Sequence, residues 1–218
     1  MINLPDFKQT FEYENNFYLT SAPNRLGKCL AHYELFRLVN ELEGDIIECG
    51  VFKGASFLRF ATFQEQFGKK DRKIIGFDTF GRFPDTNFSE DKIHRKDFVE
   101  EAGESSISKG QLLSVIEKKG LKTSVELIAG DVLETVPEYV KTHPNLKIAL
   151  LNLDTDIYEP AVTILKYLYP LIVKGGILIS DDYKVFPGET KAIDDYFKGK
   201  NVEIKSFSKL KTPHYIIK

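Results

Sequence analysis

Five short apolar segments, each ending in an acidic residue or in an acid and a glycine, restrict the fold of this chain more than any other feature. Between them lie longer segments whose apolar residues recur at three- and four-residue intervals, as is typical of amphipathic helices. Parallel strands need crossover connections of this kind, so the alternation predicts an α/β fold with a doubly wound, mostly parallel sheet. The predicted strands are DIIECG (45–50), KIIGFD (73–78), SVELIAGD (124–131), LKIALLNLD (146–154) and GGILISDD (175–182).

The fourth segment is the most informative of the five. Residues 148–153 form an apolar run that is too short for a typical helix and has no polar alternation, as expected for a parallel strand covered on both faces. Ligands bind at the carboxyl ends of strands in open α/β sheets, and this end carries Asp154 and Asp156. If the chain stays extended beyond Leu153, the two carboxylates point to the same side.

The flanking segments complete a single predicted domain, residues 1–218. Residues 1–44 are expected to form an aromatic-rich arm, which packs on the body or on a second subunit of a homodimer, followed by an amphipathic helix. Residues 81–106 belong to a connection much longer than is usual in such a fold, and they are predicted to form a lid. Residues 201–207 and 213–218 are predicted to pair as an antiparallel C-terminal hairpin at one edge of the sheet.

The charge balance and the cysteine content narrow the range of partners. With 30 basic and 32 acidic residues the formal net charge is -2, which gives no electrostatic reason to expect nucleic-acid binding. No uninterrupted apolar stretch is long enough to span a membrane, and the amino-terminal sequence has no signal-peptide pattern. The two cysteines, Cys29 and Cys49, suit a reducing compartment. We therefore expect a cytoplasmic protein that acts on a small molecule.

A glycine-containing turn, ECGVFKG, follows the first predicted strand. Gly50 and Gly54 allow a ligand to approach the backbone closely, and the helix that follows offers free amide groups. The turn is not G-x-G-x-x-G, so the fingerprint that binds a pyrophosphate is absent. A ligand without phosphates but with an amino acid end suits this turn better, because Glu48 could hold an ammonium group directly or through water.

Single acids follow the second and third predicted strands. Asp78 could accept hydrogen bonds from both hydroxyl groups of a ribose, and Asp131 could bind the exocyclic amine of an adenine. Each residue has an alternative explanation, because an acid before a turn or helix is also a common cap. Together with the glycine turn, the two acids describe a nucleoside with an amino acid tail, which is the shape of S-adenosylmethionine.

Four further carboxylates come together if the fourth and fifth strands are neighbours: Asp154, Asp156, Asp181 and Asp182. They would repel one another unless a cation or protons intervene. A set with oxygen ligands only favours a hard cation such as magnesium, and zinc is disfavoured. Asp181 and Asp182 are adjacent, so both reach one site only if the chain turns at the end of the strand. The alternative is that these acids cap helices or accept hydrogen bonds from loop amides.

These residues resemble the macrocin O-methyltransferase family, which includes enzymes that methylate sugar hydroxyls in macrolide and aminocoumarin antibiotics. The resemblance lies in ECGVFKG, GFDTFGRFPD, LNLDTDIYEPAVTILKYLYPLIVKGGILISDDY and PGETKAIDDYF, and it extends to FYLTSAPNRLGKCLAHYELF near the amino end. It implies a Rossmann-like class I methyltransferase fold with S-adenosylmethionine as the methyl donor. It also implies a magnesium ion held by Asp154, Asp181 and Asp182, with Asp156 as the general base.

The predicted function is therefore a magnesium-dependent, S-adenosylmethionine-dependent O-methyltransferase that acts on a hydroxyl group of a small molecule. That this acceptor is a sugar or a glycoconjugate follows from the resemblance alone. Two alternatives stay open. A glycosyltransferase could use residues 154–156 as a D-x-D metal site for a nucleotide sugar, although this leaves the ECGVFKG turn unexplained. A non-catalytic relative could bind S-adenosylmethionine as a sensor or scaffold.

Overall fold

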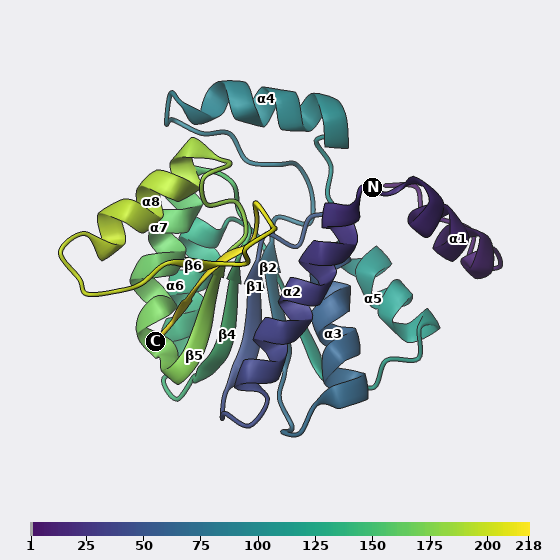
Figure 1. The fold of residues 1–218 in the computed structure, drawn as a ribbon, viewed down its shortest axis with the longest axis horizontal. Coiled ribbons are helices and arrows are strands. Elements are labelled where there is room, and N and C mark those ends of the chain that lie inside the picture. Colours follow the sequence, from purple (N-terminus) through teal and green to yellow (C-terminus); the bar gives the residue numbers. More distant parts are fainter. Residues whose placement is uncertain (1) are drawn as a thin grey trace.

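The computed structural model describes residues 2–218, which form a seven-stranded sheet with helices on both faces (Figure 1). The strands are β1 (Asp45–Cys49), β2 (Ile74–Asp78), β3 (Val125–Ala129), β4 (Ile148–Leu153), β5 (Ile172–Ser180), β6 (Lys205–Ser206) and β7 (His214–Ile217). They lie in the order β3-β2-β1-β4-β5-β7-β6. Strands β1 to β5 pair in parallel, whereas β7 is antiparallel to both β5 and β6. The predicted doubly wound, mostly parallel sheet with an antiparallel C-terminal edge is therefore confirmed.

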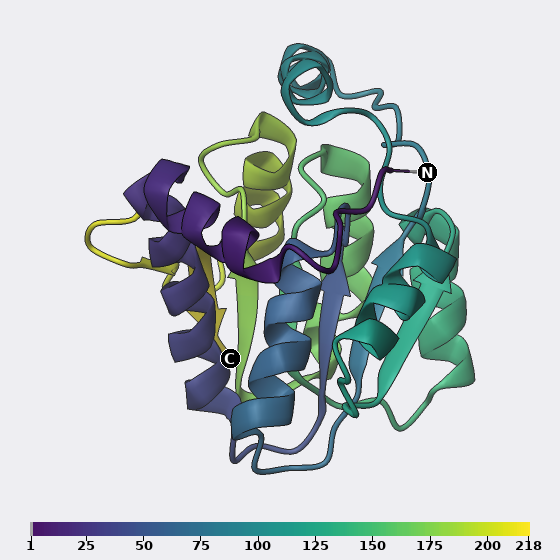
Figure 2. The same ribbon diagram turned by 90° about the vertical axis from the view of Figure 1, so that its right-hand side faces the viewer.

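Two apolar clusters, one on each face, fill the space between the sheet and the helices. The helices are α1 (Thr10–Thr20), α2 (Pro23–Val39), α3 (Ala55–Phe67), α4 (Asp91–Ala102), α5 (Lys109–Lys118), α6 (Val132–Thr142), α7 (Tyr158–Tyr167) and α8 (Pro187–Phe197), with a short 3-10 helix η1 (Tyr169–Leu171). Buried side chains of α2, α3 and α5 pack on the face toward the viewer in Figure 2, and those of α6, α7 and α8 pack on the opposite face. None of these helices combines the length and apolar composition that a membrane crossing requires.

The strand order reverses between β1 and β4, which lie side by side in the sheet. From β1 the chain continues to β2 on one side, and from β4 it continues to β5 on the other. The crevice outside such a reversal is where open α/β sheets bind ligands. Cys49 pairs with Leu153 at the carboxyl ends of these strands, so the residues that follow each strand are neighbours in space.

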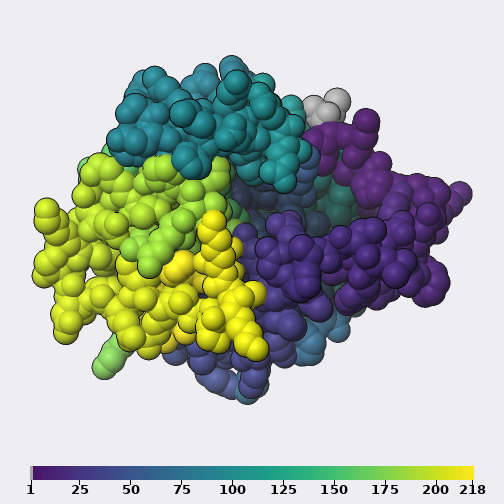
Figure 3. Space-filling model, turned by 45° about the horizontal axis from the view of Figure 1, so that its top comes forward, coloured from purple at the N-terminus to yellow at the C-terminus, as the bar shows by residue number. Residues whose placement is uncertain are grey.

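The long connection after β2 rises over the carboxyl edge of the sheet. Within residues 81–106 the chain forms α4, which runs across the top of the molecule in Figure 1 and covers that edge in Figure 3. The sequence predicted the long connection but not this helix, whose charged residues show no apolar face. We call residues 81–106 the lid; the name expresses a proposal about its role.

Both ends of the chain differ in detail from the predictions. Helix α1 forms where the sequence showed no clear helical period; it contains no buried residue and projects from one side of the molecule (Figure 1). Strand β6 has only two residues, so most of the predicted strand 201–207 is irregular. Pro213 has no amide hydrogen for a ladder, and β7 accordingly begins one residue later, at His214.

Candidate active site

A pocket opens at the carboxyl edge of the sheet, between the ends of β1, β2 and β4 and the lid. Its walls include five residues that the sequence predicted as site residues, namely Gly50, Asp78, Asp131, Asp154 and Asp156. Aromatic side chains complete the walls: Phe52 comes from the turn after β1, and Phe83 and Phe98 come from the lid. The ring centroid of Phe98 lies 5.3 Å from that of Phe52 and 5.4 Å from that of Phe83. Aromatic packing thus holds the lid against the pocket.

Gly50 brings the ends of β1 and β4 into contact. Its φ of 94° lies in the left-handed region that favours glycine, and a Cβ atom on it would lie 1.7 Å from the carbonyl oxygen of Asp154. The backbone amide of Asp154 donates a hydrogen bond to the carbonyl oxygen of Cys49 at 3.0 Å. The sequence analysis expected a ligand to approach Gly50. In the structure, the backbone of Asp154 occupies that close position. Gly54, with a φ of 83°, begins α3 as its N-cap.

Asp78 ends β2 and connects three loops. Its Oδ2 accepts a hydrogen bond from the backbone amide of Phe52 at 2.9 Å. Its Oδ1 accepts from the backbone amide of Phe80 at 2.6 Å and from the hydroxyl of Ser106 at 3.0 Å. The capping alternative is thus present in the structure, and the residue also lines the pocket where the sequence predicted a ribose contact.

Asp131 likewise combines two positions. It is the N-cap of α6, where its Oδ1 accepts a hydrogen bond from the backbone amide of Leu133 at 2.9 Å. It is also exposed and lies on the pocket wall. Capping and ligand contact are therefore compatible for this residue, and the adenine contact stays a prediction.

Glu48 lies deeper than the sequence suggested. It is fully buried in β1, and its Oε1 accepts a hydrogen bond from the hydroxyl of Ser56 at 2.6 Å. It does not belong to the pocket wall described above. Burial raises the pKa of Glu48 to about 8, because the charged form loses its hydration. Direct contact with a donor ammonium group would require rearrangement, so a contact through water or Ser56 fits this position better.

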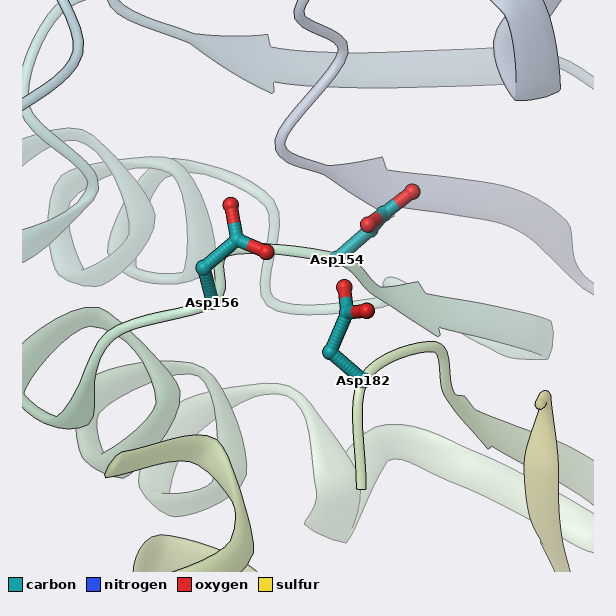
Figure 4. Close-up of side chains that lie close together, drawn as sticks. All are labelled: Asp154, Asp156 and Asp182. Atoms are coloured by element: carbon teal, nitrogen blue, oxygen red, sulfur yellow. The ribbon is translucent and has the colours of Figure 1, made fainter. Parts of the chain in front are cut away.

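Three of the four clustered carboxylates converge beyond the ends of β4 and β5 (Figure 4). Asp154, Asp156 and Asp182 each offer one oxygen, and these oxygens lie within 4.8 Å of one another. Asp156 reaches the group from a left-handed backbone conformation with a φ of 64°, so the condition of an extended chain beyond Leu153 is not met. Burial, and then the neighbouring negative charges, raise the pKa of each of the three carboxylates above its usual value.

Asp181 makes different contacts. Strand β5 ends at Ser180, and Asp181 meets side chains from α2. Lys28 forms an ion pair with its Oδ2, and Nε2 of His32 lies 3.3 Å from its Oδ1. Burial alone would raise the pKa of Asp181, but the hydrogen bond with His32 and the positive charge of Lys28 hold it well below its usual range. The sequence analysis predicted neither of these two partners.

Glu189, which the sequence analysis did not single out, is hydrogen-bonded to the segment that carries Asp182. It lies fully buried in the first turn of α8. Its Oε1 accepts hydrogen bonds from the hydroxyl of Ser180 at 2.6 Å and from the backbone amide of Asp182 at 3.0 Å. It therefore fixes the backbone that carries Asp182. An acid in the first turn of a helix is common, so the sequence contains no signal that this one is buried.

Asp91, a second buried acid outside the sequence predictions, ties the lid to the sheet domain. It begins α4, and its carboxylate accepts hydrogen bonds from the backbone amides of Tyr158 at 2.9 Å and Gly188 at 2.7 Å. These amides belong to the first turns of α7 and α8, whose positive ends favour a carboxylate. A Cβ atom on Gly188 would lie 1.9 Å from Oδ2 of Asp91, so glycine is needed for this approach.

The donor set of the cluster fits a hard divalent cation. Its ligand atoms are carboxylate oxygens, which magnesium prefers and zinc does not. Burial and, after it, the mutual repulsion of the carboxylates raise the pKa values of Asp154 and Asp156, and a cation would relieve the repulsion. Asp181 could join such a set only by exchanging its present partners. The choice of ligands between Asp156 and Asp181 therefore stays a prediction.

Comparison with known protein sequences places this geometry in context. A family model for macrocin O-methyltransferase (TylF) matches residues 24–208. Demethyldecarbamoylnovobiocin O-methyltransferase from Streptomyces niveus is 28% identical over 163 residues, which cover 72% of this chain and 59% of the relative. Mycinamicin III 3''-O-methyltransferase from Micromonospora griseorubida is 26% identical over 171 residues, which cover 77% and 65%. The chain spans less than two thirds of the length of these two relatives.

Solved structures show the same architecture. CalS11, described as a calicheamicin methyltransferase, matches with a TM-score of 0.79 at 28% identity, over 99% of this chain and 87% of that one. The O-methyltransferase NovP matches with a TM-score of 0.74 at 23% identity, over 89% and 79%. At that identity the likeness to NovP concerns the fold alone. Both comparisons agree with the predicted class I methyltransferase sheet.

Proposed function

Because the chain belongs to the macrocin O-methyltransferase family, we propose that it is an S-adenosylmethionine-dependent O-methyltransferase. Its acceptor is a hydroxyl group of a small molecule, a sugar or a glycoconjugate, and magnesium is its second cofactor. One observation carries this proposal: the pocket and the acid cluster share a wall. Asp154 and Asp156 line the pocket and also belong to the cluster with Asp182. A donor in the pocket and an acceptor hydroxyl at the cluster would meet at these two residues.

The pocket offers the donor both polar and apolar contacts. Asp78 accepts hydrogen bonds from the ribose hydroxyls, and Asp131 accepts one from the adenine amine. The rings of Phe52 and Phe98 provide apolar surface beside them. S-adenosylmethionine, when bound, supplies an electrophilic methyl group on a positively charged sulfur. The buried carboxylate of Glu48 interacts with the ammonium group of the donor indirectly, through Ser56 or a water molecule.

The acid cluster would hold the metal ion, and it also contains the proposed base. Asp154, Asp181 and Asp182 are the metal ligands in this proposal, and Glu189 keeps the backbone of Asp182 in place. A divalent cation, when bound, supplies positive charge that favours deprotonation of the acceptor hydroxyl. Asp156 is the remaining carboxylate of the cluster, so it is free to accept that proton.

The methyl transfer is a direct displacement. The acceptor oxygen attacks the methyl carbon, its proton moves to a carboxylate oxygen of Asp156, and the bond from carbon to sulfur breaks. S-adenosylhomocysteine leaves, and no covalent enzyme intermediate forms. Positioning of the two reactants supplies much of the rate enhancement. The lid excludes water, which would otherwise weaken the attraction between the positive sulfur and the negative oxygen.

The first experiment separates donor binding, metal binding and transfer. Calorimetry with S-adenosylhomocysteine and with magnesium measures the two binding steps, and a labelled donor tested against a panel of sugars, nucleotide sugars and glycosides measures transfer. We expect Asp154→Ala to lose magnesium binding and turnover while donor affinity is nearly unchanged. We expect Asp156→Asn to keep both binding steps and to transfer methyl groups more slowly by on the order of a hundredfold.

Other outcomes of the same experiment contradict the proposal. Equal loss of donor and metal binding in Asp154→Ala would make this residue a structural part of the pocket. Unchanged turnover in Asp156→Asn would remove it as the base. Binding of a nucleoside diphosphate sugar but not of S-adenosylmethionine would support a glycosyltransferase with a D-x-D site. Donor binding without transfer to any acceptor would support a non-catalytic role.

A further inference from the structure

Lys28 brings a positive charge to the acid cluster from α2, which packs on the sheet face opposite to α7 and α8. It lies in the second turn of α2, and its Nζ forms an ion pair with Oδ2 of Asp181. The Lys28 side chain is 21% exposed, whereas Asp181 is 1% exposed, so the charge is largely withdrawn from solvent. Neither the sequence motifs nor the proposed reaction gives this lysine a role.

The charge of Lys28 acts on more than one carboxylate. Burial alone would lower the pKa of Lys28, but the negative charges of Asp181, Asp154 and Asp182 raise it above its ordinary value. A lysine ammonium group is positive throughout the physiological pH range. The three carboxylates that stabilise it are the same three that the proposed function assigns to magnesium.

The two partners of Asp181 differ in their freedom to move. His32 is fully buried, and its ring stacks on that of Phe60 at a centroid distance of 5.1 Å. Lys28 has a long flexible stem that reaches solvent, so its head group can withdraw without disturbing the core. If Asp181 has to free an oxygen for another cation, Lys28 is the partner that can leave.

We propose that Lys28 is a built-in counter-cation: it neutralises the acid cluster in the metal-free protein and leaves Asp181 when a divalent cation binds. This inference rests on the proposed metal site. Two cations near the same carboxylates repel each other, so occupancy by one weakens binding of the other. As a consequence, the metal-free protein keeps a buried acid paired, and metal loading is a competition that depends on the magnesium concentration.

Calorimetric titration of magnesium into Lys28→Met tests the competition. Methionine keeps most of the apolar stem and removes the charge. We expect the variant to bind magnesium on the order of tenfold more tightly than the wild type, because the competing cation is gone. We also expect its Tm without metal to fall by about 5 °C, because Asp181 keeps only His32, and saturating magnesium to recover most of that loss.

Two further variants are the controls. Lys147→Met removes the same charge from an exposed ion pair with Glu43, and Lys147 precedes β4 at the opposite edge of the sheet. It should leave magnesium affinity and the magnesium-dependent part of the Tm unchanged. Lys28→Arg keeps the positive charge and should therefore stay close to the wild type in magnesium affinity.

The wild-type protein provides a measurement that does not depend on the folding of a variant. Acetylation of individual lysines by an amine-reactive reagent is followed by mass spectrometry with and without magnesium. Acetylation of Lys28 should accelerate when magnesium is added, because its amine leaves the ion pair, whereas acetylation of Lys147 should not change. A Lys28 rate that stays constant or falls in saturating magnesium contradicts the proposal.

The outcomes separate failure of this inference from failure of the metal site. If the wild type and Lys28→Met bind magnesium equally, the site is real and the competition is refuted. Weaker binding in Lys28→Met would make Lys28 an aid to metal binding, which is the opposite of the proposal. If neither protein binds magnesium, the proposed metal site and the competition are both refuted.

Discussion

Some carboxylates that line the pocket, such as Asp78 and Asp131, also accept hydrogen bonds from the backbone of the fold. Asp78 accepts hydrogen bonds from Phe52, Phe80 and Ser106 while it lines the pocket, so its position is fixed before any ligand arrives. Prior positioning of this kind reduces the cost of ordering a ligand contact. A substitution of such a carboxylate can therefore weaken ligand binding by disturbing the fold. A useful substitution removes the ligand contact but keeps the structural contact.

Asp131 allows that separation. Serine is a good N-cap but is too short to replace a carboxylate contact, whereas alanine loses both. Asp131→Ser and Asp131→Ala should both bind S-adenosylhomocysteine about five- to tenfold more weakly in calorimetry if the carboxylate contacts the adenine. Only Asp131→Ala should lower the Tm of the ligand-free protein, by about 2–4 °C. Wild-type affinity in Asp131→Ser would reduce Asp131 to a helix cap.

Among the elements, the lid is joined to the remainder of the domain by few polar contacts. Asp91 reaches the first turns of α7 and α8, and Glu159 of α7 accepts hydrogen bonds from the hydroxyl of Thr86 at 2.9 Å and the amide of Asn87 at 2.8 Å. Helix α7 directly follows the segment that carries Asp156. The lid and the segment that carries Asp156, the proposed base, therefore both contact the start of α7.

Asp91→Ala should loosen the lid. It removes a carboxylate that two helix amides share, at a cost of about 2 kcal/mol, and leaves those amides without their present acceptor. Hydrogen exchange in residues 83–104 should accelerate, and the KM for the donor should rise more than kcat falls. Asp85→Ala is the matched control, because Asp85 is an exposed lid acid whose ion pairs with Arg82 and Arg95 lie within the lid. Equal exchange in the two variants would show that Asp91 does not tether the lid.

The elements also show which parts of the molecule a sequence can predict. Apolar runs such as residues 148–153 gave the parallel strands, because a strand buried on both faces has a distinctive composition. Helix α4, which lies within the lid, escaped prediction because it is rich in charged residues and has little apolar periodicity. The two-residue strand β6 depends on its pairing with β7, which no local pattern encodes.

At the scale of the whole molecule, residues far apart in the chain meet at one edge of the sheet. Their types and order predicted a cluster of Asp154, Asp156, Asp181 and Asp182, because the carboxyl ends of neighbouring parallel strands coincide. The structure groups three of these acids and leaves Asp181 with other partners. The pairing of Asp181 with Lys28 was not predicted, because it joins residues 153 positions apart through the packing of α2. Sequence patterns thus predicted which edge of the sheet carries the acids, whereas the partner of each carboxylate depended on tertiary packing.

Buried acids make the stability of the fold depend on pH. Glu48 is suited to measuring this effect, because it is buried and is not one of the proposed metal ligands. Its pKa is about 8 in the folded protein, against an ordinary value of 4.5. Between these values the folded state holds a proton that the unfolded state has lost. The contribution of Glu48 to stability is therefore full below pH 4.5 and is lost as the pH rises to about 8.

Glu48→Gln should remove this dependence, because the amide keeps the volume and can still accept the hydrogen bond from Ser56 but cannot ionise. Urea unfolding of wild type and variant, without magnesium and at constant ionic strength from pH 5 to 8, measures the effect. The free energy of unfolding of the variant relative to wild type should increase over this range, by on the order of a few kcal/mol. Glu43→Gln, at an exposed ion pair with Lys147, should give a difference that does not vary with pH. A constant difference for Glu48→Gln would mean that Glu48 is already ionised in the fold, and a cation or donor group beside it would then be required.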